Sequence, residues 1–228
     1  MIKKKKTIFY LSLCKDKFLT QTMKLLLKNP DTAFNVPESA LLKNGNSATL
    51  VKYKLDNNEF VIKRYNMKTS RHALRRAFKK SRADHSWHYA HLISKMKIHT
   101  PFPVAMKEKR WGPFRNKAFF ICEYVEGPTA LNYFNDPEID HAAKSAIAEK
   151  IIAMFGLLKS AMITHGDMKA TNIIIHNMEP YLIDLDSMTA HKTDFRFKRA
   201  WQKDIKRFMK NWKDLPGVFQ LFSQLRIV

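Results

Sequence analysis

Residues 165–188, HGDMKATNIIIHNMEPYLIDLDSM, constrain the fold of this chain more than any other stretch. The β-branched run 173–175 and the apolar run 181–183 predict two short strands, and Glu179-Pro180 marks a turn between them. Because a tight hairpin brings its two ends side by side, the polar side chains that flank the strands should converge. These side chains are Asp167, Lys169, Asn172, Asp184 and Asp186.

This set of side chains suits transfer of a phosphoryl group from a metal-bound nucleotide. Asp167 can orient a hydroxyl group and accept its proton, and Lys169 can neutralise the moving phosphoryl group. Asn172 and Asp184 can hold Mg²⁺, and Asp186 can assist. Any one of these residues could equally belong to a polar hairpin with solvated carboxylates. The ordered set H-G-D-x-K-x-x-N, strand, turn, strand, I-D-x-D favours the catalytic interpretation, because each element has its own part in the chemistry.

The motifs H-G-D-M-K-A-T-N and L-I-D-L-D-S-M resemble those of the protein-kinase-like superfamily. The branch with HGD in place of HRD and IDxD in place of DFG contains aminoglycoside, choline and lipopolysaccharide kinases. The chain looks most like the lipopolysaccharide core kinases, which phosphorylate heptose or Kdo sugars, over most of its length from about Leu41 onward. The resemblance implies an α+β, two-lobed protein-kinase-like fold. Residues 1–126 would form a small N-lobe with an antiparallel sheet, and residues 127–228 a short, mainly helical C-lobe.

Residues 41–65 read as a hairpin, and its second strand carries Lys63 between apolar residues. In the family that it resembles, such a lysine contacts the α- and β-phosphates of ATP. Taken alone, Lys63 could also lie on the exposed face of an edge strand. The turn that would cover the phosphates has one glycine, Gly45, where protein kinases have three. Gly45 and Ser47 still allow backbone N–H groups near phosphate.

The run I-C-E-Y-V-E-G in residues 121–127 resembles the kinase hinge. The resemblance implies that the carbonyl of Glu123 and the N–H of Val125 bind adenine, with the ATP cleft near Gly127. An ordinary core strand over residues 118–125 is the alternative. The position of this run between Lys63 and the HGD loop favours the hinge.

The helix predicted for residues 82–96 departs from the family pattern. In most kinases a Glu of this helix pairs with the strand lysine. Counting back from Thr100-Pro101 places Ser86 at that position, with Asp84 as the nearest acid. Either Asp84 substitutes for the Glu or the ion pair is absent.

The C-terminal third is predicted to be helical. Residues 135–159 show apolar residues at helical spacing. Two basic helical stretches follow Asp186, and Asp204, in the sequence K-D-I-K-R-F, is expected to brace the HGD loop from a final helix. His165 is expected to pack the loop rather than to act as a base. The segment contains no A-P-E motif, and protein kinases use a longer segment there to bind peptide. We therefore expect a compact, non-protein acceptor.

The charge balance predicts an anionic partner. Lys and Arg number 41 against 20 Asp and Glu, giving a net charge of +21. Every charged residue from Lys63 to Arg82 is basic, which is typical of an anion-docking element, although a merely soluble basic helix is the alternative. Nucleic acid, a membrane surface and an anionic glycolipid all fit such charge. The resemblance favours the glycolipid and a membrane surface over nucleic acid.

The N-terminal residues resemble an export signal in their basic start and apolar run but lack its other features. The apolar run 8–14 is interrupted by Ser12 and is followed by charged residues, with no small-residue cleavage site. We expect a strand or a surface segment here. No run of 18 apolar residues occurs, so no membrane span is expected. Two cysteines are too few for a disulfide framework and fit a reducing compartment.

Together these features predict an ATP- and Mg²⁺-dependent kinase that phosphorylates a sugar hydroxyl of the lipopolysaccharide inner core. The expected location is cytoplasmic, peripheral at the inner face of the inner membrane. Two alternatives stay open. One is a kinase with another small-molecule or protein acceptor, and the other is a weakly catalytic pseudokinase that binds anionic surfaces. The sequence makes no prediction of the oligomeric state.

Overall fold

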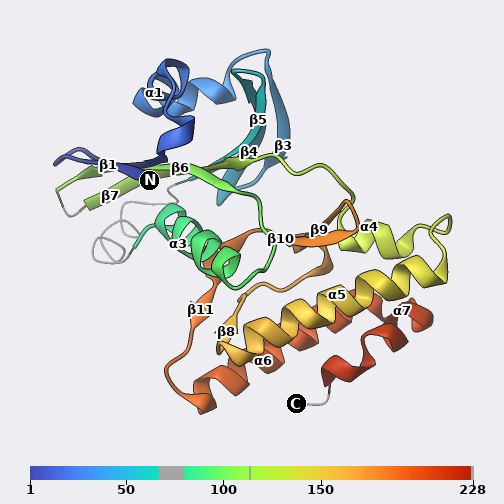
Figure 1. Ribbon diagram of the computed structural model, residues 1–228. Helices are drawn as coiled ribbons and strands as arrows, with labels where there is room; N and C mark the ends of the chain where they lie inside the picture. The colour runs from blue at the N-terminus through green and yellow to red at the C-terminus, as the bar shows by residue number, and fades with distance from the viewer. Residues whose placement is uncertain (67–79, 113, 227–228) are drawn as a thin grey trace. The chain divides into compact units, whose positions relative to one another are not determined.

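The computed structural model describes residues 1–66, 80–112 and 114–226 (Figure 1). The chain divides into two compact units. Unit 1 comprises Met1–His91 and Pro101–Tyr124, and unit 2 comprises Leu92–Thr100 and Val125–Val228. An antiparallel sheet and several helices make up the fold, which confirms the predicted mixture of α and β structure.

Unit 1 is built on a seven-stranded antiparallel sheet with the order β1-β2-β6-β7-β5-β4-β3 (Figure 1). Its strands are β1 (Ile2–Lys6), β2 (Tyr10–Lys15), β3 (Ser39–Asn44), β4 (Ala48–Leu55), β5 (Asn58–Tyr65), β6 (Pro103–Trp111) and β7 (Phe114–Glu123). The hairpin predicted for residues 41–65 is present as β4 and β5. Asp56 and Asn57 connect them with φ of 48° and 63°, which suits a two-residue hairpin turn. A third strand, β3, which was not predicted, pairs with β4.

One face of this sheet carries the core of unit 1. Helix α1 (Gln21–Lys28) and the 3-10 helix η2 (Pro30–Phe34) pack there, and the Thr20 hydroxyl caps α1 by accepting the Met23 N–H at 3.1 Å. Along β5, Phe60 and Ile62 enter this core because alternate residues of a strand share a face. Lys63 and Tyr65 therefore lie on the opposite face, which is the face contacted by helix α3 (Arg82–Lys95).

The N-terminal residues form strands, one of the two possibilities expected for them. β2 pairs with β6 in the interior of the sheet, and β1 forms its edge with all five residues exposed. Within the described residues, no helix combines the length and the hydropathy that a membrane crossing requires.

Unit 2 is mainly helical. Its helices are α4 (Ala130–Asn135), α5 (His141–Ser160), α6 (Asp194–Met209) and α7 (Pro216–Leu221). Two small antiparallel pairs complete it, β8 (Ile163–Thr164) with β11 (Thr189–Ala190) and β9 (Ile173–His176) with β10 (Glu179–Leu182). An aromatic cluster joins these helices, with ring centroids 4.9–5.8 Å apart. Its members are Phe134, Phe155, Trp201, Phe208, Trp212 and Phe222.

Two boundaries predicted for unit 2 are wrong. The helix expected over residues 135–159 begins at His141, because the Asp140 carboxylate accepts the Ala143 N–H at 2.7 Å and caps it there. The turn expected at Glu179-Pro180 lies at Asn177 and Met178, which have positive φ. Pro180 has no N–H to donate, but its position in β10 does not require one. Its partner Ile175 donates its own N–H to the Pro128 carbonyl, so the two residues form a non-hydrogen-bonded pair.

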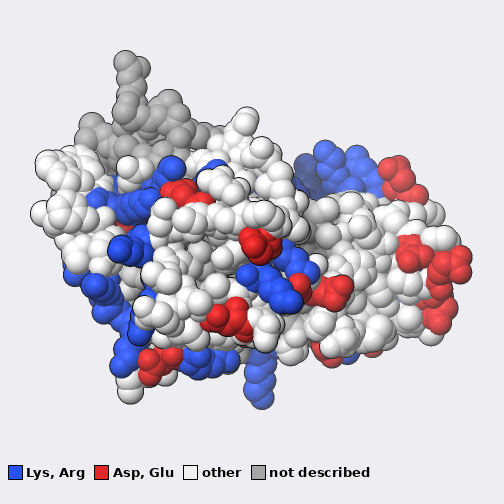
Figure 2. All heavy atoms as spheres, turned by 90° about the horizontal axis from the view of Figure 1, so that it is seen from above, with Lys and Arg blue, Asp and Glu red and all other residues white. Residues whose placement is uncertain are grey.

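Most of the basic block between Lys63 and Arg82 lies outside the described residues, which omit 67–79. Elsewhere the surplus of basic residues is spread over the surface. Figure 2 shows blue Lys and Arg side chains at many points of one face, with red Asp and Glu side chains among them.

Candidate active site

The two strand pairs of unit 2 bring the polar ends of the predicted hairpin together. Leu182 pairs with Ile173, and the Ile183 N–H donates to the Asn172 carbonyl at 2.9 Å, so Asp184 follows directly beside Asn172. Thr189 of β11 pairs with Thr164 of β8, which returns the chain to the start of the HGD loop. The backbone at the two ends of the predicted hairpin therefore lies side by side in the structure.

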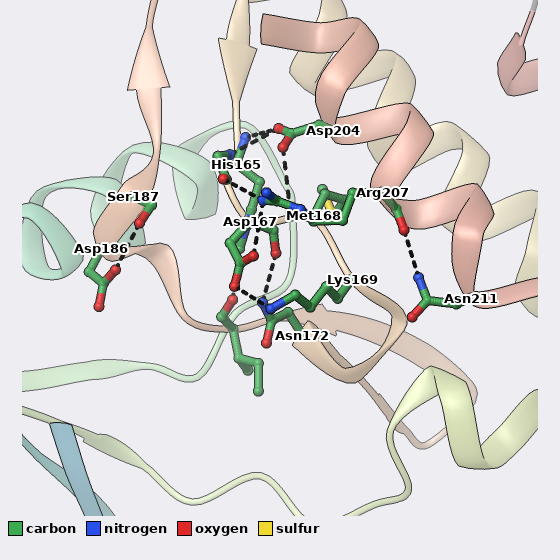
Figure 3. Close-up of polar contacts among 12 residues, drawn as sticks. His165, Asp167, Met168, Lys169, Asn172, Asp186, Ser187, Asp204, Arg207 and Asn211 are labelled. Carbon is green, nitrogen blue, oxygen red and sulfur yellow. Dashed lines mark hydrogen bonds and ion pairs between the residues drawn. The ribbon is translucent and has the colours of Figure 1, made fainter. Parts of the chain in front are cut away.

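Asp167 lies at the centre of this loop (Figure 3). Its Oδ2 accepts a hydrogen bond from Lys169 Nζ at 2.9 Å, and its Oδ1 accepts one from Arg207 at 3.0 Å. The side chains of Asp167, Lys169 and Arg207 are 33%, 46% and 44% exposed. Ion pairs with this exposure contribute about 0–1 kcal/mol. Lys169 can therefore exchange Asp167 for another anion without a large free-energy cost.

Arg207 is a site residue that the sequence analysis missed. It comes from α6 and donates to the Gly166 carbonyl at 2.8 Å as well as to Asp167, so it fixes both the backbone and the carboxylate of the loop. Its position three residues after Asp204 is the signal that could have found it, because such residues share a helix face.

Asp204 braces the HGD loop, as predicted. Its carboxylate is 2% exposed and accepts the N–H groups of His165 and Gly166 at 2.7 and 2.9 Å, with Met168 N at 3.5 Å (Figure 3). A buried carboxylate requires such donors, because isolated charge is strongly disfavoured in the interior. His165 is fully buried, and its Nε2 lies 2.9 Å from the Ile183 carbonyl, so it packs the loop as expected.

Asn172 is anchored by the same loop. It ends the 3-10 helix η3 (Ala170–Asn172), and its Nδ2 donates to the Asp167 carbonyl at 2.8 Å. The side-chain oxygen, Oδ1, is then the atom that a cation would meet. The amide is 9% exposed, so its orientation is set by the protein.

Asp184 and Asp186 stand on either side of a tight bend. Asp184 is in the left-handed region, with φ 63° and ψ 48°, and precedes the 3-10 helix η4 (Leu185–Ser187). Such a conformation is uncommon for a residue with a side chain, and it clusters at functional sites. Asp186 is 9% exposed, and its Oδ1 accepts the Ser187 hydroxyl at 3.1 Å.

Gly166 is required by the close approach of this bend. Its φ is +81°, and a Cβ added there would lie 2.6 Å from the Ser187 carbonyl oxygen. A glycine at this position lets the loop that carries Asp167 lie against the segment that carries Asp184 and Asp186.

In unit 1, Lys63 is buried, with 9% exposure. It lies between Leu50 and Phe120 in the strand ladders, and its Nζ is 4.9 Å from the centre of the Tyr65 ring. Burial raises the pKa of the nearby Cys122 thiol to about 12, so that thiol is neutral and is not a counter-ion for the lysine. The exposed-edge alternative for Lys63 is excluded.

The turn with Gly45 and Ser47 connects β3 and β4. The Gly45 N–H donates to the Ala48 carbonyl at 3.1 Å, and its carbonyl accepts Asn66 Nδ2 at 3.2 Å. The Ser47 carbonyl accepts from the Asn66 N–H at 3.1 Å and from Arg82 at 3.3 Å. These bonds tie the turn to the end of β5 and to the start of α3.

Glu123 is the last residue of β7. Its N–H donates to the Phe102 carbonyl at 3.0 Å, and the next N–H, of Tyr124, donates to Glu59 at 2.9 Å. Hydrogen-bonded and non-hydrogen-bonded pairs alternate in an antiparallel ladder, so the Glu123 carbonyl points away from β5. Val125 follows as the first residue of this stretch in unit 2.

The position expected for the helix Glu holds Ser86, which is 2% exposed. Its hydroxyl shares a hydrogen bond of 2.8 Å with the Tyr65 hydroxyl. The Asp84 carboxylate lies 3.9 Å from Lys80 Nζ and is not part of the hydrogen bond between Ser86 and Tyr65. The residue at the position of the family's helix Glu therefore forms a neutral hydrogen bond between α3 and β5.

The side chains near the bend fit magnesium better than a metal held by protein alone. Among the described residues, no three His, Cys, Asp or Glu side chains form a group that could hold a metal ion. Mg²⁺ needs only one or two carboxylates, because water and substrate phosphates complete its shell. Asp184 and Asp186 supply two carboxylates, and Asn172 adds an amide oxygen.

Comparison with known proteins identifies the family. A search of curated proteins found no match. A family model described as the lipopolysaccharide kinase (Kdo/WaaP) family matches residues 35–220, which include Lys63, the HGD loop and Arg207. The match covers well over half of the chain. The chain therefore belongs to the lipopolysaccharide kinase (Kdo/WaaP) family, whose members are phosphotransferases.

Proposed function

We propose that this kinase transfers the γ-phosphoryl group of ATP to a sugar hydroxyl of the lipopolysaccharide inner core. The observation that carries the proposal is the set of contacts around Asp167. Its carboxylate has Lys169 at 2.9 Å and Arg207 at 3.0 Å, and its backbone carbonyl accepts from Asn172. A carboxylate, a movable cation and an oriented amide are the groups that phosphoryl transfer requires.

In the proposed reaction, Asp167 orients the sugar hydroxyl and accepts its proton. The hydroxyl oxygen forms a bond to the γ-phosphorus while the bond from that phosphorus to the bridging oxygen breaks, and ADP leaves. Lys169 exchanges Asp167 for the moving phosphoryl group, since its present ion pair is exposed and weak. Arg207 keeps Asp167 in place after Lys169 has moved, because it also donates to the Gly166 carbonyl.

Lys63 is proposed to neutralise the α- and β-phosphates of ATP, with the turn at Gly45 and Ser47 over them. The Glu123 carbonyl and the Val125 N–H would bind adenine. Asn172 and Asp184 would hold Mg²⁺, with Asp186 assisting. When bound, Mg²⁺ neutralises the charge of the β- and γ-phosphates. The burial of Lys63 supports its part, because an ammonium group held away from bulk water attracts a phosphate more strongly than a solvated one does.

The proposed acceptor follows from the family rather than from the contacts, because a fold does not determine a substrate. Lipopolysaccharide core sugars belong to anionic glycolipids, and the net charge of +21 suits them. The corresponding location is the cytoplasmic face of the inner membrane, as a peripheral protein.

The test is phosphoryl transfer from Mg-ATP to a panel of core oligosaccharides that differ in one heptose or Kdo residue, with mass detection of the phosphorylated product. We expect a single phosphate on one sugar. Arg199→Ala, an exposed cation of α6 without a proposed role, is the control for Arg207→Ala, which should slow transfer. ATP consumption without any phosphorylated oligosaccharide would refute the acceptor.

A rival function is a membrane-binding module with the kinase fold and little catalysis. The neutral Ser86, which stands at the position of the helix Glu of most kinases and bonds Tyr65, favours it. The same assay separates the two functions, because a non-catalytic module would bind glycolipid vesicles and leave ATP intact.

A further inference from the structure

Four large apolar side chains are exposed at one end of the sheet of unit 1. Ile8 and Phe9 are 61% and 63% exposed in the turn between β1 and β2, and Trp111 and Phe114 are 67% and 40% exposed at the turn between β6 and β7. Single exposed apolar residues are ordinary, but a contiguous group marks an interaction site. Ile8, Phe9, Trp111 and Phe114 are called the tip patch below.

Backbone hydrogen bonds hold the two turns together. The Arg110 N–H donates to the Phe9 carbonyl at 2.8 Å, and the Gly112 N–H donates to the Ile8 carbonyl at 2.9 Å. The Trp111 and Phe114 rings stack with centroids 6.2 Å apart and an interplanar angle of 18°. Both turns lie at the left end of the sheet in Figure 1. The two hairpins therefore present the four side chains of the tip patch at the same end of the sheet.

Basic residues flank the tip patch. β1 leads into it through Lys3, Lys4, Lys5 and Lys6, and every one is exposed. On the adjoining strands, Arg110 and Arg115 both form ion pairs with the fully buried Glu108, so the positive charges of this group outnumber the negative one. In Figure 2 uncharged side chains protrude at the left end, with blue Lys and Arg side chains beside them. The surroundings of the patch are thus cationic.

We propose that the tip patch inserts into the headgroup region of an anionic lipid bilayer, with the lysines of β1 against the lipid phosphates. Trp favours this region because its amphipathic ring lies at the level of the headgroups, and Phe favours it because its apolar ring is buried at the acyl boundary. Each basic residue near an anionic membrane adds attraction that falls within a Debye length. Apolar side chains on protruding turns with cations behind them are complementary to such a surface.

The composition of the patch favours a bilayer over nucleic acid. Proteins that bind single strands stack bases on aromatic faces within a basic groove. Here the Trp111 and Phe114 rings stack on each other, and aliphatic Ile8 stands beside Phe9 on a protrusion. The tip patch contains none of the proposed catalytic residues, and vesicle binding needs neither ATP nor a sugar acceptor. A failure of the proposed reaction therefore leaves it unaffected.

Trp111 supplies a direct readout. The other three tryptophans, Trp87, Trp201 and Trp212, are at most 6% exposed, whereas Trp111 is 67% exposed. Titration of the full chain with phosphatidylcholine vesicles containing phosphatidylglycerol should shift tryptophan emission to the blue and protect it from acrylamide. Vesicles of phosphatidylcholine alone should give a much smaller shift. Trp111→Phe should keep vesicle binding and lose the shift.

Co-sedimentation with the same vesicles tests the patch by substitution. Phe9→Ser with Trp111→Ser should weaken binding at least about tenfold, because the removed rings no longer leave water. The matched control is Leu25→Ser with Leu41→Ser, which changes side chains that are 60% and 62% exposed on α1 and β3. Lys4→Glu with Lys6→Glu should weaken binding at low salt and imitate the effect of high salt on the unmodified chain.

Three results would overturn the proposal. Equal vesicle binding by the tip variant and its control would place the membrane contact elsewhere. Binding to a single-stranded oligonucleotide that the tip variant alone loses would assign the patch to nucleic acid. A concentration-dependent dimer that only the tip variant abolishes would assign it to a second copy of the chain. Thermal melts of each variant establish that any loss is not unfolding.

Discussion

Replacing Asp204 by Asn should destabilise the HGD loop and slow catalysis together. The carboxylate accepts two N–H groups at 2.7 and 2.9 Å and is 2% exposed, with Met168 N at 3.5 Å. A hydrogen bond to a charged group contributes about 1.5–3 kcal/mol, and a neutral one about 0.5–1.5 kcal/mol. Two bonds that lose their charge should therefore lower the free energy of unfolding by about 2–3 kcal/mol.

Asp204→Ala should have a larger effect, on the order of 4 kcal/mol, because it leaves buried N–H groups without an acceptor. Urea unfolding followed by tryptophan fluorescence measures both variants. The control is Asp194→Asn on the same helix, whose carboxylate is 65% exposed and pairs with Lys198. It should change stability by less than about 0.5 kcal/mol. If Asp204→Asn unfolds like this control and keeps full phosphoryl-transfer activity, Asp204 does not brace the loop.

Three further predictions concern the bend, the metal and pH. Gly166→Ala should lower the free energy of unfolding by about 2 kcal/mol or more, since φ is +81° and the new Cβ would meet Ser187. Gly217→Ala is the control and should not lower this free energy, because the space around Gly217 is open. Urea unfolding compares the two variants. Asp184→Asn keeps a residue that tolerates the left-handed conformation but removes a charge, so calorimetry should show weaker ATP binding in the presence of Mg²⁺ and a nearly unchanged melting temperature. Equal Mg-ATP affinity in that variant would exclude Asp184 as a metal ligand. Burial lowers the pKa of His191, whose Nε2 lies 2.8 Å from the Thr164 hydroxyl. The contribution of the neutral imidazole to stability is therefore present above the unfolded-state pKa of about 6.5 and is lost as the pH falls below that value. His191→Gln should flatten that part of the pH dependence of unfolding, and an unchanged profile would contradict the assignment.

Local sequence signals predicted the elements that position the site. The β-branched run before His176 and the apolar run before Asp184 predicted the two strands of the hairpin, which are β9 and β10, but not their register. The turn was misplaced because proline usually marks a turn. Here Pro180 sits at a non-hydrogen-bonded position of β10, and Asn177 and Met178 make the turn instead. Methionine at positive φ is uncommon, so nothing in the residue types indicated it.

Contacts between distant segments were harder to predict. Arg207 reaches Asp167 across 40 residues, and α6 contains many other basic side chains that look the same in sequence. The contact of Ser86 with Tyr65 depends on how α3 packs on β5. The tip patch depends on the pairing of β2 with β6, which places two separate turns side by side. Pairing of this kind is set by the whole sheet rather than by a local pattern.

The rate of phosphoryl transfer by Asp167→Ala, measured at saturating Mg-ATP beside its ATP affinity, tests the central claim most directly. Asp167 is proposed to accept the hydroxyl proton, so kcat should fall by roughly 10²–10⁴, the usual contribution of a positioned general base. ATP affinity should stay within a few-fold, since the proposed phosphate and adenine contacts are made by other residues. Transfer at a rate near that of the unmodified chain would show that the HGD loop is not the catalytic centre.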